Sequence, residues 1–404
     1  MRVKKKVAII GGGAAGVFAA INLAEKNPDY EIFIFEANSK ALSKVLVSGG
    51  GRCNVTNNTP NPSEIIKKYP RGSRELLGPM TVFGVNETIS WFRNRGVRLK
   101  TEDDNRVFPE TDSSGTIANC LLSNSEKAGI KIFYKEKVQR IEKTDKNFII
   151  HLKNTNEFFD SVMLSTGSSE TGFKFAENLG HRIIPPVPSL FTFEIEHPLI
   201  KGLSGVCFRD SISSIQFEKI MYENRGPLLI THWGLSGPSV IVLSSVAARE
   251  LHSSNYKATL KLNLIPDLNL EEAAKILSIY RERNIRKPVI KSNPFNIPAS
   301  FWERFVEFTE NKNLTYQELS KKTILEFINK LKSLPFEING KGKFKEEFVT
   351  AGGIDLKEVN FKTMESKICA NLFFAGEILD IDGITGGFNF QSAWTTAWIA
   401  SQNI

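Results

Sequence analysis

A glycine cluster near the start of the chain has the spacing of a phosphate-binding turn. Gly11, Gly13 and Gly16 fit the pattern G-x-G-x-x-G, which follows the apolar run Val7–Ile10 and opens a helical pattern. The first glycine of such a unit permits a tight turn, the second lets a pyrophosphate approach the backbone, and the third lets helix and strand pack closely. The helix N-terminus offers N–H groups to the phosphates. Glu36 ends the next apolar run, where an acid can accept hydrogen bonds from an adenosine ribose. The pattern predicts a dinucleotide site.

A second glycine region near the other end of the chain favours FAD over NAD. Gly376 and Glu377 follow an apolar run, and Gly386-Gly387 precedes a helical pattern. An elongated FAD molecule needs a second contact region of this kind. The acid after Gly376 can bind ribityl hydroxyls, and backbone N–H groups near Gly386 to Asn389 can face the N1–C2=O edge of the flavin. The positive end of that helix favours the anionic reduced flavin.

Apolar runs and helical patterns place both glycine regions in one α/β domain. The first 36 residues read as strand, glycine turn, helix and strand, which is a βαβ unit. Residues 37–60 are expected to be loop-like. Further helices are predicted at about 62–68, 86–95, 114–128 and 388–401, and further strands at 130–134, 137–142, 148–152, 162–167 and 371–376.

A proline-rich stretch, Pro185-Pro-Val-Pro188, indicates a domain boundary. The residues after it carry short alternating runs and look β-rich, whereas the stretch from 270 to 333 has helical spacing. We therefore expect one Rossmann-type α/β domain from both chain ends, with a two-part insertion. The predicted bounds are 1–190 with 349–404 for the FAD domain, 191–268 with 334–348 for a β-barrel-like domain, and 269–333 for a helical domain.

Composition excludes several classes of protein. The chain has 404 residues, of which 41% are apolar and 24% charged, so it is no disordered, collagenous or disulfide-scaffold protein. Four Cys without a CxxC pair and only five His predict no metal site, and scattered reduced thiols suggest the cytoplasm. We do not expect the basic start to be a signal peptide, because glycines interrupt the apolar stretch. Residues 226–248 lack charge but contain a Gly-Pro turn, so no membrane span is expected.

The net charge of +8 suggests weak affinity for anions without identifying a partner. The densest basic run is Arg281-Glu-Arg-Asn-Ile-Arg-Lys287. Two interpretations stay open for it: a functional anion patch, or a solvated helix end.

Five long motifs together resemble one family, the BaiN-like (YhiN-like) flavoproteins, also called the aminoacetone oxidase family. The resemblance runs from about residue 5 to 402. The motifs are Val47-Ser-Gly-Gly-Gly-Arg-Cys-Asn-Val-Thr-Asn57, Asn105-Arg-Val-Phe-Pro109, Thr231-His-Trp-Gly-Leu-Ser-Gly-Pro238, Val349-Thr-Ala-Gly-Gly-Ile354 and the stretch from Phe374 to Gln391.

The resemblance implies a bound FAD and the three domains described above. It also implies contacts to the cofactor from a set of residues matched by position. These are Gly11, Gly13, Ala14, Gly16, Glu36, Ala37, Lys44, Gly50, Gly51, Arg52, Cys53, Asn54, Val138, Thr166, Gly167, Gly376, Glu377, Gly386, Gly387, Phe388 and Asn389. Val138 resembles a strand residue whose backbone touches adenine. The loop after Gly167 is shorter than in relatives, which weakens any transfer of substrate identity.

Three side chains could take part in the chemistry. His232 is a candidate acid–base group because imidazole titrates near neutrality, although a structural hydrogen bond is the favoured interpretation. Arg52 could offset pyrophosphate or flavin charge, or form a structural salt bridge. Cys53 lacks a second cysteine nearby, so a packed or flavin-neighbouring thiol is favoured over a redox pair.

The sequence thus predicts an enzyme, an FAD-dependent oxidoreductase that transfers a hydride between a small-molecule substrate or NAD(P)H and flavin N5. The resemblance suggests reduction of an activated C=C bond or oxidation of a small amine, and a substrate cleft between the FAD domain and the insertion. Without a second G-x-G-x-x-G, NAD(P)H is expected only as a transient reductant. The alternative is a protein that holds FAD structurally and has an RNA-binding or tRNA-modification role, although no RNA-binding motif supports a nucleic-acid partner. The sequence does not indicate the oligomeric state.

Overall fold

The computed structural model describes residues 4–342 and 349–404, and the chain divides into two compact units. Unit 1 comprises Met1–Val187 and Thr350–Ile404, and unit 2 comprises Pro188–Val349. The two chain ends therefore build one unit, and the division falls close to the predicted boundaries. The finer division of the insertion into a β-rich and a helical domain stays a prediction.

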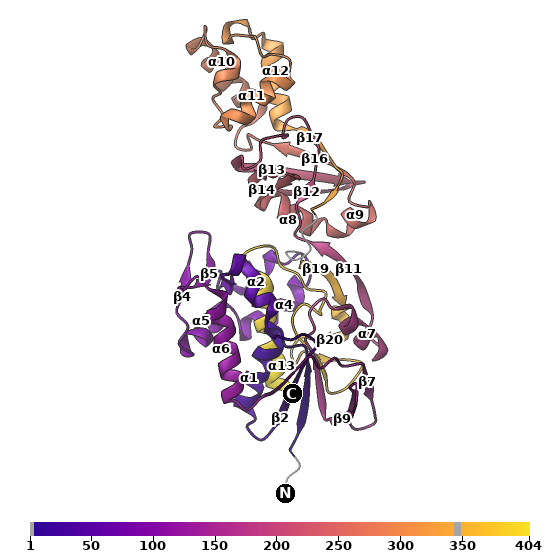
Figure 1. The fold of residues 1–404 in the computed structure, drawn as a ribbon. Helices are drawn as coiled ribbons and strands as arrows, with labels where there is room; N and C mark the ends of the chain where they lie inside the picture. The colour runs from indigo at the N-terminus through magenta and orange to yellow at the C-terminus, as the bar shows by residue number, and fades with distance from the viewer. Residues whose placement is uncertain (1–3, 343–348) are drawn as a thin grey trace. The chain divides into compact units, whose positions relative to one another are not determined.

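Unit 1 is built around a seven-stranded sheet with the order β20-β21-β22-β10-β1-β2-β6 (Figure 1). The strands from β22 to β6 run parallel, and the two short strands at the other edge are antiparallel. The bounds are β1 Lys6–Ile10, β2 Glu31–Glu36, β6 Lys131–Tyr134, β10 Ser161–Leu164, β20 Val359–Asn360, β21 Glu365–Ser366 and β22 Leu372–Phe374.

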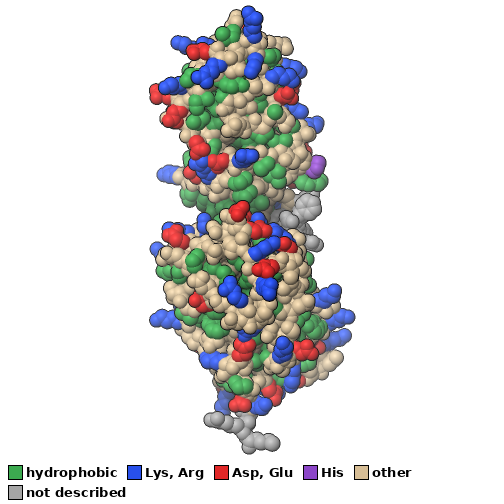
Figure 2. All heavy atoms as spheres, turned by 90° about the vertical axis from the view of Figure 1, so that its left-hand side faces the viewer, with side chains coloured by type: hydrophobic (Ala, Val, Ile, Leu, Met, Phe, Trp, Pro, Cys, Tyr) green, Lys and Arg blue, Asp and Glu red, His purple; other side chains and the backbone are tan. Residues whose placement is uncertain are grey.

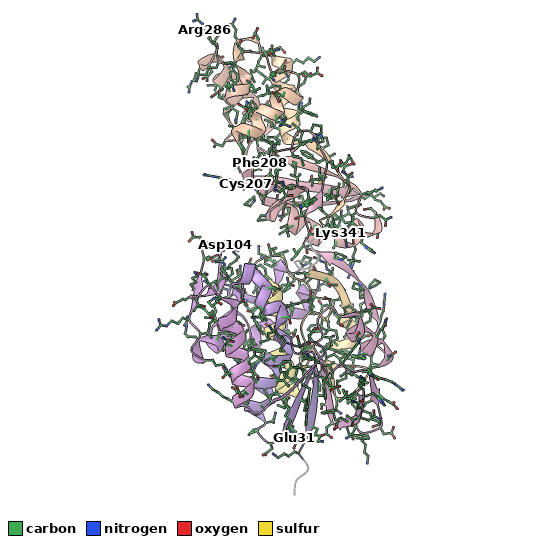
Figure 3. The ribbon with its side chains drawn as sticks, viewed as in Figure 1. Glu31, Asp104, Cys207, Phe208, Arg286 and Lys341 are labelled. Atoms are coloured by element: carbon green, nitrogen blue, oxygen red, sulfur yellow. The ribbon has the colours of Figure 1, made fainter. Side chains whose placement is uncertain are left out.

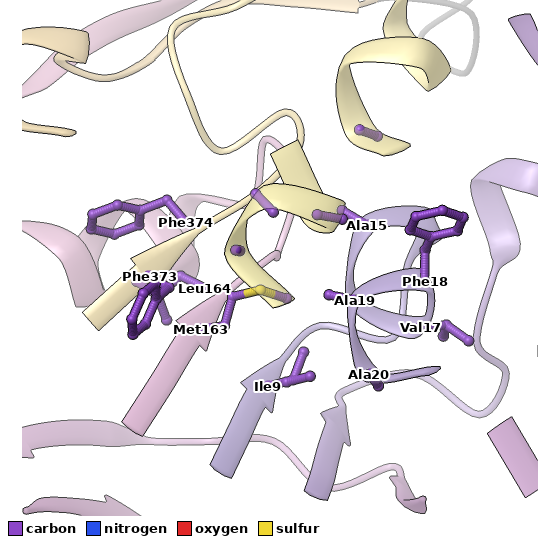
Figure 4. Packing of buried hydrophobic residues seen from close by; sticks show 14 of the residues in the cluster. Ile9, Ala15, Val17, Phe18, Ala19, Ala20, Met163, Leu164, Phe373 and Phe374 are labelled. Atoms are coloured by element: carbon purple, nitrogen blue, oxygen red, sulfur yellow. The ribbon is translucent and has the colours of Figure 1, made fainter. Parts of the chain in front are cut away.

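The central strands are apolar on both faces, as parallel strands between helices must be. Val7, Ala8 and Ile9 of β1 are fully buried, and α1 (Ala14–Lys26) packs against α13 (Phe388–Asn403) over the sheet. Figure 4 shows Ile9 and Phe18 within this cluster. The first and the last helix of the chain are thus neighbours, which brings the two predicted glycine regions together.

Smaller sheets and further helices complete unit 1. A three-stranded sheet has the order β3-β5-β4, another has β7-β8-β9, and β11 pairs with β19 where the chain leaves and re-enters the unit. The strands are β3 Thr56–Asn57, β4 Leu99–Thr101, β5 Arg106–Pro109, β7 Arg140–Lys143, β8 Phe148–His151, β9 Asn156–Phe159, β11 Ile183–Ser189 and β19 Val349–Ile354. The helices are α2 Ser43–Gly51, α3 Pro62–Ile65, α4 Ser73–Val82, α5 Val85–Asn94, α6 Ser114–Lys127 and α7 Glu170–Asn178, with the 3-10 turns Ile66–Lys68 and Leu356–Glu358.

Unit 2 combines an antiparallel sheet with helices over one hydrophobic cluster. The sheet order is β17-β16-β13-β14-β15-β12-β18, and within the described residues β17 and β18 remain edges, so the sheet does not close into a barrel. Its strands are β12 Phe193–Glu194, β13 Cys207–Phe217, β14 Ile220–Ile230, β15 Gly234–Ser236, β16 Ala258–Asn263, β17 Leu334–Ile338 and β18 Gly340–Lys341. The helices are α8 Pro238–Val246, α9 Ala248–Ser253, α10 Leu270–Arg283, α11 Ala299–Phe308 and α12 Lys321–Lys332, with 3-10 turns at Val289–Lys291 and Tyr316–Glu318.

Several sequence predictions of local structure were wrong. Residues 37–60, expected to be loop-like, contain α2, whose torsions leave the helical range at Ser48, Gly49 and Gly50. The glycines at the end of α2 obscured the helical pattern of the residues that precede them. The helices α4 and α7 were not predicted. Val138 lies in the connection before β7 and not within a strand.

No helix in the described part of the chain is long and apolar enough to cross a membrane.

Candidate functional site

The glycine turn after β1 is shaped by close backbone approaches. Gly11 has a φ of +106°, and a Cβ there would lie 2.6 Å from the Ser165 carbonyl oxygen. A Cβ on Gly16 would lie 2.0 Å from the Gly11 carbonyl oxygen, so only glycine fits at both positions. Gly13, the N-cap residue of α1, has open space around its missing Cβ. The turn therefore leaves room for a ligand at Gly13, beside first-turn N–H groups that have no acceptor within the helix.

Glu36 is fixed at the end of β2 by hydrogen bonds from the neighbouring backbone. Its Oε2 accepts from the Gly12 N–H at 2.9 Å, and its Oε1 accepts from Asn38 N and Nδ2 at 2.7 and 2.8 Å. Only 8% of Glu36 is exposed, whereas Ala37 after it is exposed. Because a carboxylate offers about four acceptor positions, one remains for a ribose hydroxyl.

Val138 lies on the same side of unit 1 as Glu36. The connection before it is held by the Lys135 N–H to the Asn38 carbonyl at 2.9 Å and by the Glu136 N–H to the Glu36 carbonyl at 3.0 Å. Val138 itself is 4% exposed. The structure therefore brings Val138 near the predicted ribose acid, although not as part of a strand.

The turn after β10 is tied to the glycine turn. The Ser165 hydroxyl contacts the Ile10 and Gly11 carbonyls at 3.1 and 3.0 Å. The Thr166 hydroxyl is buried and has no hydrogen-bond partner among the described residues. A Cβ on Gly172 would lie 1.8 Å from this oxygen, so the hydroxyl packs against α7. A buried hydroxyl without a partner is destabilising.

Lys44, Gly167 and Glu377 converge from three distant parts of the chain. Lys44 Nζ lies 2.6 Å from Glu377 Oε2. A Cβ on Gly167 would lie 3.7 Å from that carboxylate oxygen and 3.8 Å from the Lys44 ammonium. Glu377 Oε1 also accepts from the Thr350 N–H at 3.3 Å. All three residues were predicted as cofactor contacts, and the fold places them together.

The segment from Gly50 to Asn54 is tied to the start of α13. The Asn54 amide donates to the carbonyls of Thr56 and Val107 at 2.9 and 3.2 Å, and its oxygen accepts from the Gly387 N–H at 2.9 Å. Gly387 has a φ of +92°, and a Cβ there would lie 2.6 Å from the Thr56 carbonyl oxygen. This contact positions the N-terminus of α13, and the φ values of Gly50 and Gly51 are positive as well.

The side chain of Asn389 also has a structural role. Its oxygen accepts from the Gly383 N–H at 2.8 Å, and its amide donates to the Gly383 carbonyl at 2.9 Å. This pair of bonds closes the loop before α13 and leaves the backbone N–H groups of Phe388 and Asn389 as the groups available to a ligand, as predicted for a helix N-terminus.

Sequence analysis missed a contact strip between residues 68–72 and 381–388. Arg71 forms an ion pair with Asp382, whose side chain is fully buried, and the Tyr69 hydroxyl donates to the Phe388 carbonyl at 2.7 Å. The Ile384 N–H donates to the Lys68 carbonyl at 2.9 Å. Asp382 lies within the motif from Phe374 to Gln391, but its partner is remote in sequence. This strip holds the loop that carries Gly386 and Gly387.

Arg52 takes part in a structural network. Its guanidinium lies 2.6 Å from Glu102 Oε1 and 3.3 Å from Asp112 Oδ1, and it stacks on Phe108 at 4.0 Å. These two carboxylates raise the pKa of Arg52, and the hydrogen bond that Arg52 donates to Glu102 contributes most. The geometry is that of the structural salt bridge, and a contact from Arg52 to the cofactor stays a prediction.

Cys53 is fully buried with a φ of +61°. Burial raises the pKa of its thiol to about 12, although the hydrogen bond with Ser48 acts in the opposite direction. A thiol in this environment stays protonated and unreactive at neutral pH. Among the described residues no group of three or more His, Cys, Asp or Glu side chains is arranged to hold a metal ion.

His232 belongs to unit 2 and lies on the exposed turn between β14 and β15. The turn is closed by the Thr231 N–H, which donates to the Gly234 carbonyl at 2.8 Å. These backbone contacts do not distinguish an acid–base role of His232 from a structural hydrogen bond. An acid–base role of His232 therefore stays a prediction.

Comparison with known proteins identifies the family. The family described as "HI0933-like protein Rossmann domain" matches residues 5–403. The chain belongs to this family. It is the FAD-binding Rossmann family to which the sequence motifs pointed, so the predicted family and fold class are confirmed.

Three known proteins resemble the chain over nearly its full length. The 3-dehydro-bile acid delta(4,6)-reductase of Clostridium scindens is 28% identical, covering 98% of each chain. A ribosomal RNA dihydrouridine synthase of Escherichia coli is 27% identical over 98% of this chain and 97% of its own, and that of Haemophilus influenzae is 28% identical with the same coverage.

Solved structures share the fold. A 3-ketosteroid-delta4-(5alpha)-dehydrogenase from Rhodococcus jostii RHA1 has a TM-score of 0.52 at 14% identity and covers 98% of this chain and 97% of its own. A flavocytochrome c3 fumarate reductase in an open conformation has a TM-score of 0.51 at 13% identity, covering 100% and 78%.

Proposed function

We propose that unit 1 holds one FAD molecule along the line from Glu36 to the start of α13. The adenosine ribose would bind Glu36, the pyrophosphate the N-terminus of α1, the ribityl chain Glu377, and the flavin edge the N–H groups at Gly387 to Asn389. The observation that carries this assignment is the convergence of Lys44, Gly167 and Glu377. These groups come from three separate segments of the chain and form one polar cluster.

Bound FAD would supply a two-electron acceptor and donor at flavin N5. The chain's own residues would bind and orient it. The positive end of α13 lowers the energy of negative charge at the flavin edge, and the Lys44 ammonium offsets phosphate charge. Because the sequence has no second G-x-G-x-x-G unit, NAD(P)H is proposed to bind only transiently as a reductant.

The reaction we propose is reduction of a C=C bond conjugated to a carbonyl group. The names of the curated relatives support this choice over amine oxidation. A delta(4,6)-reductase acts on double bonds of a 3-oxo steroid, and a dihydrouridine synthase saturates the uracil ring beside its carbonyls. For this chain we propose addition of a hydride to the β-carbon and of a proton to the α-carbon of an α,β-unsaturated carbonyl compound.

Anaerobic titration of the FAD-loaded protein tests the proposal. NADH or NADPH should bleach the visible flavin absorbance, and a conjugated enone, but not its saturated analogue, should restore it. A protein that binds FAD but is neither reduced by a nicotinamide nor reoxidised by any enone would contradict the reductase assignment. Reduction by a small amine instead would favour the oxidase reaction.

A second candidate is the same reaction on uracil within RNA. The two dihydrouridine synthases among the relatives and the net charge of +8 favour it. Mass spectrometry of RNA incubated with the reduced enzyme tests it, because each uridine reduced to dihydrouridine adds two hydrogen atoms.

A further inference from the structure

One end of the helical part of unit 2 carries exposed basic side chains that the proposed reaction does not use. We call this surface the basic tip and define it as Arg283, Arg286, Lys287, Lys321 and Lys322, all of which are exposed. Figure 3 labels Arg286 at this end, and Figure 2 shows Lys and Arg side chains on the part of the molecule formed by α10, α11 and α12.

Backbone contacts bring the two segments of the basic tip together. The Gln317 N–H donates to the Ile285 carbonyl and the Tyr316 N–H to the Lys287 carbonyl, both at 3.0 Å. Helix α10 also packs against α12. The end of α10 and the start of α12 therefore lie at one end of the bundle, although their basic residues are more than thirty positions apart in the sequence.

The charges of the basic tip are scarcely neutralised. Within residues 4–342 and 349–404, no carboxylate forms an ion pair with Arg283, Arg286, Lys287 or Lys321, and Lys322 Nζ lies 3.9 Å from Glu326. The neighbouring Glu318 carboxylate is engaged by the Thr315 N–H and hydroxyl, both at 2.7 Å. Glu282 precedes Arg283 in the sequence. The five basic residues therefore outnumber the acids Glu282, Glu318 and Glu326, and the surface keeps an excess of positive charge.

Helix stability does not account for most of these charges. Arg283 in the last turn of α10 complements the helix dipole, and Arg281 donates to the Leu319 carbonyl at 2.9 Å, which is a structural role. Lys321 and Lys322, however, occupy the first turn of α12, where the dipole disfavours cations and no acid is present. In contrast, the first turn of α10 carries Glu271 and Glu272. The cations in the first turn of α12, where α10 has acids, add positive potential at the start of α12.

We propose that the basic tip binds the phosphate backbone of a nucleic acid. This inference rests on the second candidate function, in which RNA carries the uracil to be reduced. Arginine and lysine neutralise phosphates without reading sequence. Ile285, which lies between Arg283 and Arg286 in the sequence and is 48% exposed, offers no ring for base stacking. The expected binding is therefore dependent on salt and largely independent of sequence.

The test uses the full-length FAD-loaded protein and a short fluorescein-labelled RNA stem-loop with a uridine-rich loop. The variant combines Arg283→Gln, Arg286→Gln and Lys287→Gln. The matched control combines Lys127→Gln, Lys146→Gln and Lys153→Gln, which removes the same charge from exposed positions of unit 1. Fluorescence anisotropy is followed over a series of salt concentrations, and reduction of a small enone is measured in parallel.

The tip variant should bind RNA roughly tenfold more weakly than the wild type, with a slope of log Kd against log salt lower by about 2, since each single-stranded phosphate contact contributes about 0.7. The control should bind like the wild type. Equal weakening in both variants would overturn the proposal, because net charge alone would then explain binding. It would also be overturned if the wild type binds no RNA. Binding to anionic phosphatidylserine vesicles is measured in parallel, and a tip variant that loses vesicle binding but keeps RNA binding would overturn the proposal as well.

The proposal can be separated from the reaction itself. Both variants should reduce the small enone at the wild-type rate, since none of the substituted residues belongs to the FAD site. Loss of RNA binding with intact enone reduction supports the basic tip. RNA binding through the tip in a protein that reduces no substrate would leave the surface supported and the proposed reaction refuted.

Discussion

The Lys44 ammonium and the Glu377 carboxylate lie 2.6 Å apart, although they come from opposite ends of the chain. The pair is 68% exposed at Lys44 and 22% at Glu377, so its contribution to folding is small. Its significance lies in position, because both groups face the turn at Gly167 where the proposed FAD would pass.

Lys44→Ala should therefore weaken FAD binding more than it weakens the fold. Loss of one charge-assisted hydrogen bond to a phosphate corresponds to about 1.5–3 kcal/mol, or roughly tenfold or more in Kd. Isothermal titration calorimetry measures the affinity, and thermal unfolding without FAD should be nearly unchanged. Lys40→Ala, at an exposed position just before α2, is the control. Equal FAD affinity in both variants would remove Lys44 from the site.

Two glycines of the turn after β1 should differ in their effects on protein stability and on FAD binding. Gly16→Ala places a Cβ 2.0 Å from the Gly11 carbonyl oxygen, so it should destabilise the FAD-free protein by about 3 kcal/mol or more. Gly13→Ala meets open space and should leave the melting temperature unchanged while weakening FAD binding, because the added methyl group lies where the pyrophosphate is expected. Thermal melts with and without FAD measure both effects. Unchanged FAD binding in Gly13→Ala would argue against the pyrophosphate position.

Thr166→Val tests the unpaired hydroxyl. Replacing a buried group that lacks a hydrogen bond with an apolar group of the same shape should stabilise the FAD-free protein by about 1 kcal/mol. Thr166→Ser keeps the hydroxyl and should not gain this stability. Because the hydroxyl packs against α7, both variants should bind FAD like the wild type. Urea unfolding and FAD titration measure the two effects, and weaker FAD binding in Thr166→Val alone would show that the hydroxyl contacts the cofactor.

His181 should make unit 1 less stable in mild acid. Burial lowers the pKa of this imidazole, and the Ala176 carbonyl and Glu358 oppose that shift only in part. Since the unfolded state then binds the proton more tightly, the free energy of unfolding should fall as pH drops below about 6.5, by at most about 1.4 kcal/mol per pH unit from this group. Urea unfolding across this range measures the slope. His181→Gln should flatten it, and an identical slope in the variant would assign the effect to other groups.

The order of elements around the glycine turn follows from local patterns, whereas the tertiary contacts of the site do not. Local patterns predicted the strand at Val7–Ile10, the glycine turn and the final helix. They could do so because hydrophobic periodicity and glycine spacing involve residues close together in the sequence. The pairing of Asn54 with Gly387 and of Arg71 with Asp382 joins remote segments, and no periodicity reports such contacts. The kink in α2 escaped prediction because glycines there adopt positive φ inside an otherwise helical run.

Binding of FAD to the purified full-length chain tests the central claim most directly. Titration of the FAD-free protein, followed by calorimetry and by the visible spectrum, should give one FAD bound per chain, with affinity lowered in Lys44→Ala and in Gly13→Ala. A protein that stays colourless and releases no heat with excess FAD would contradict the account.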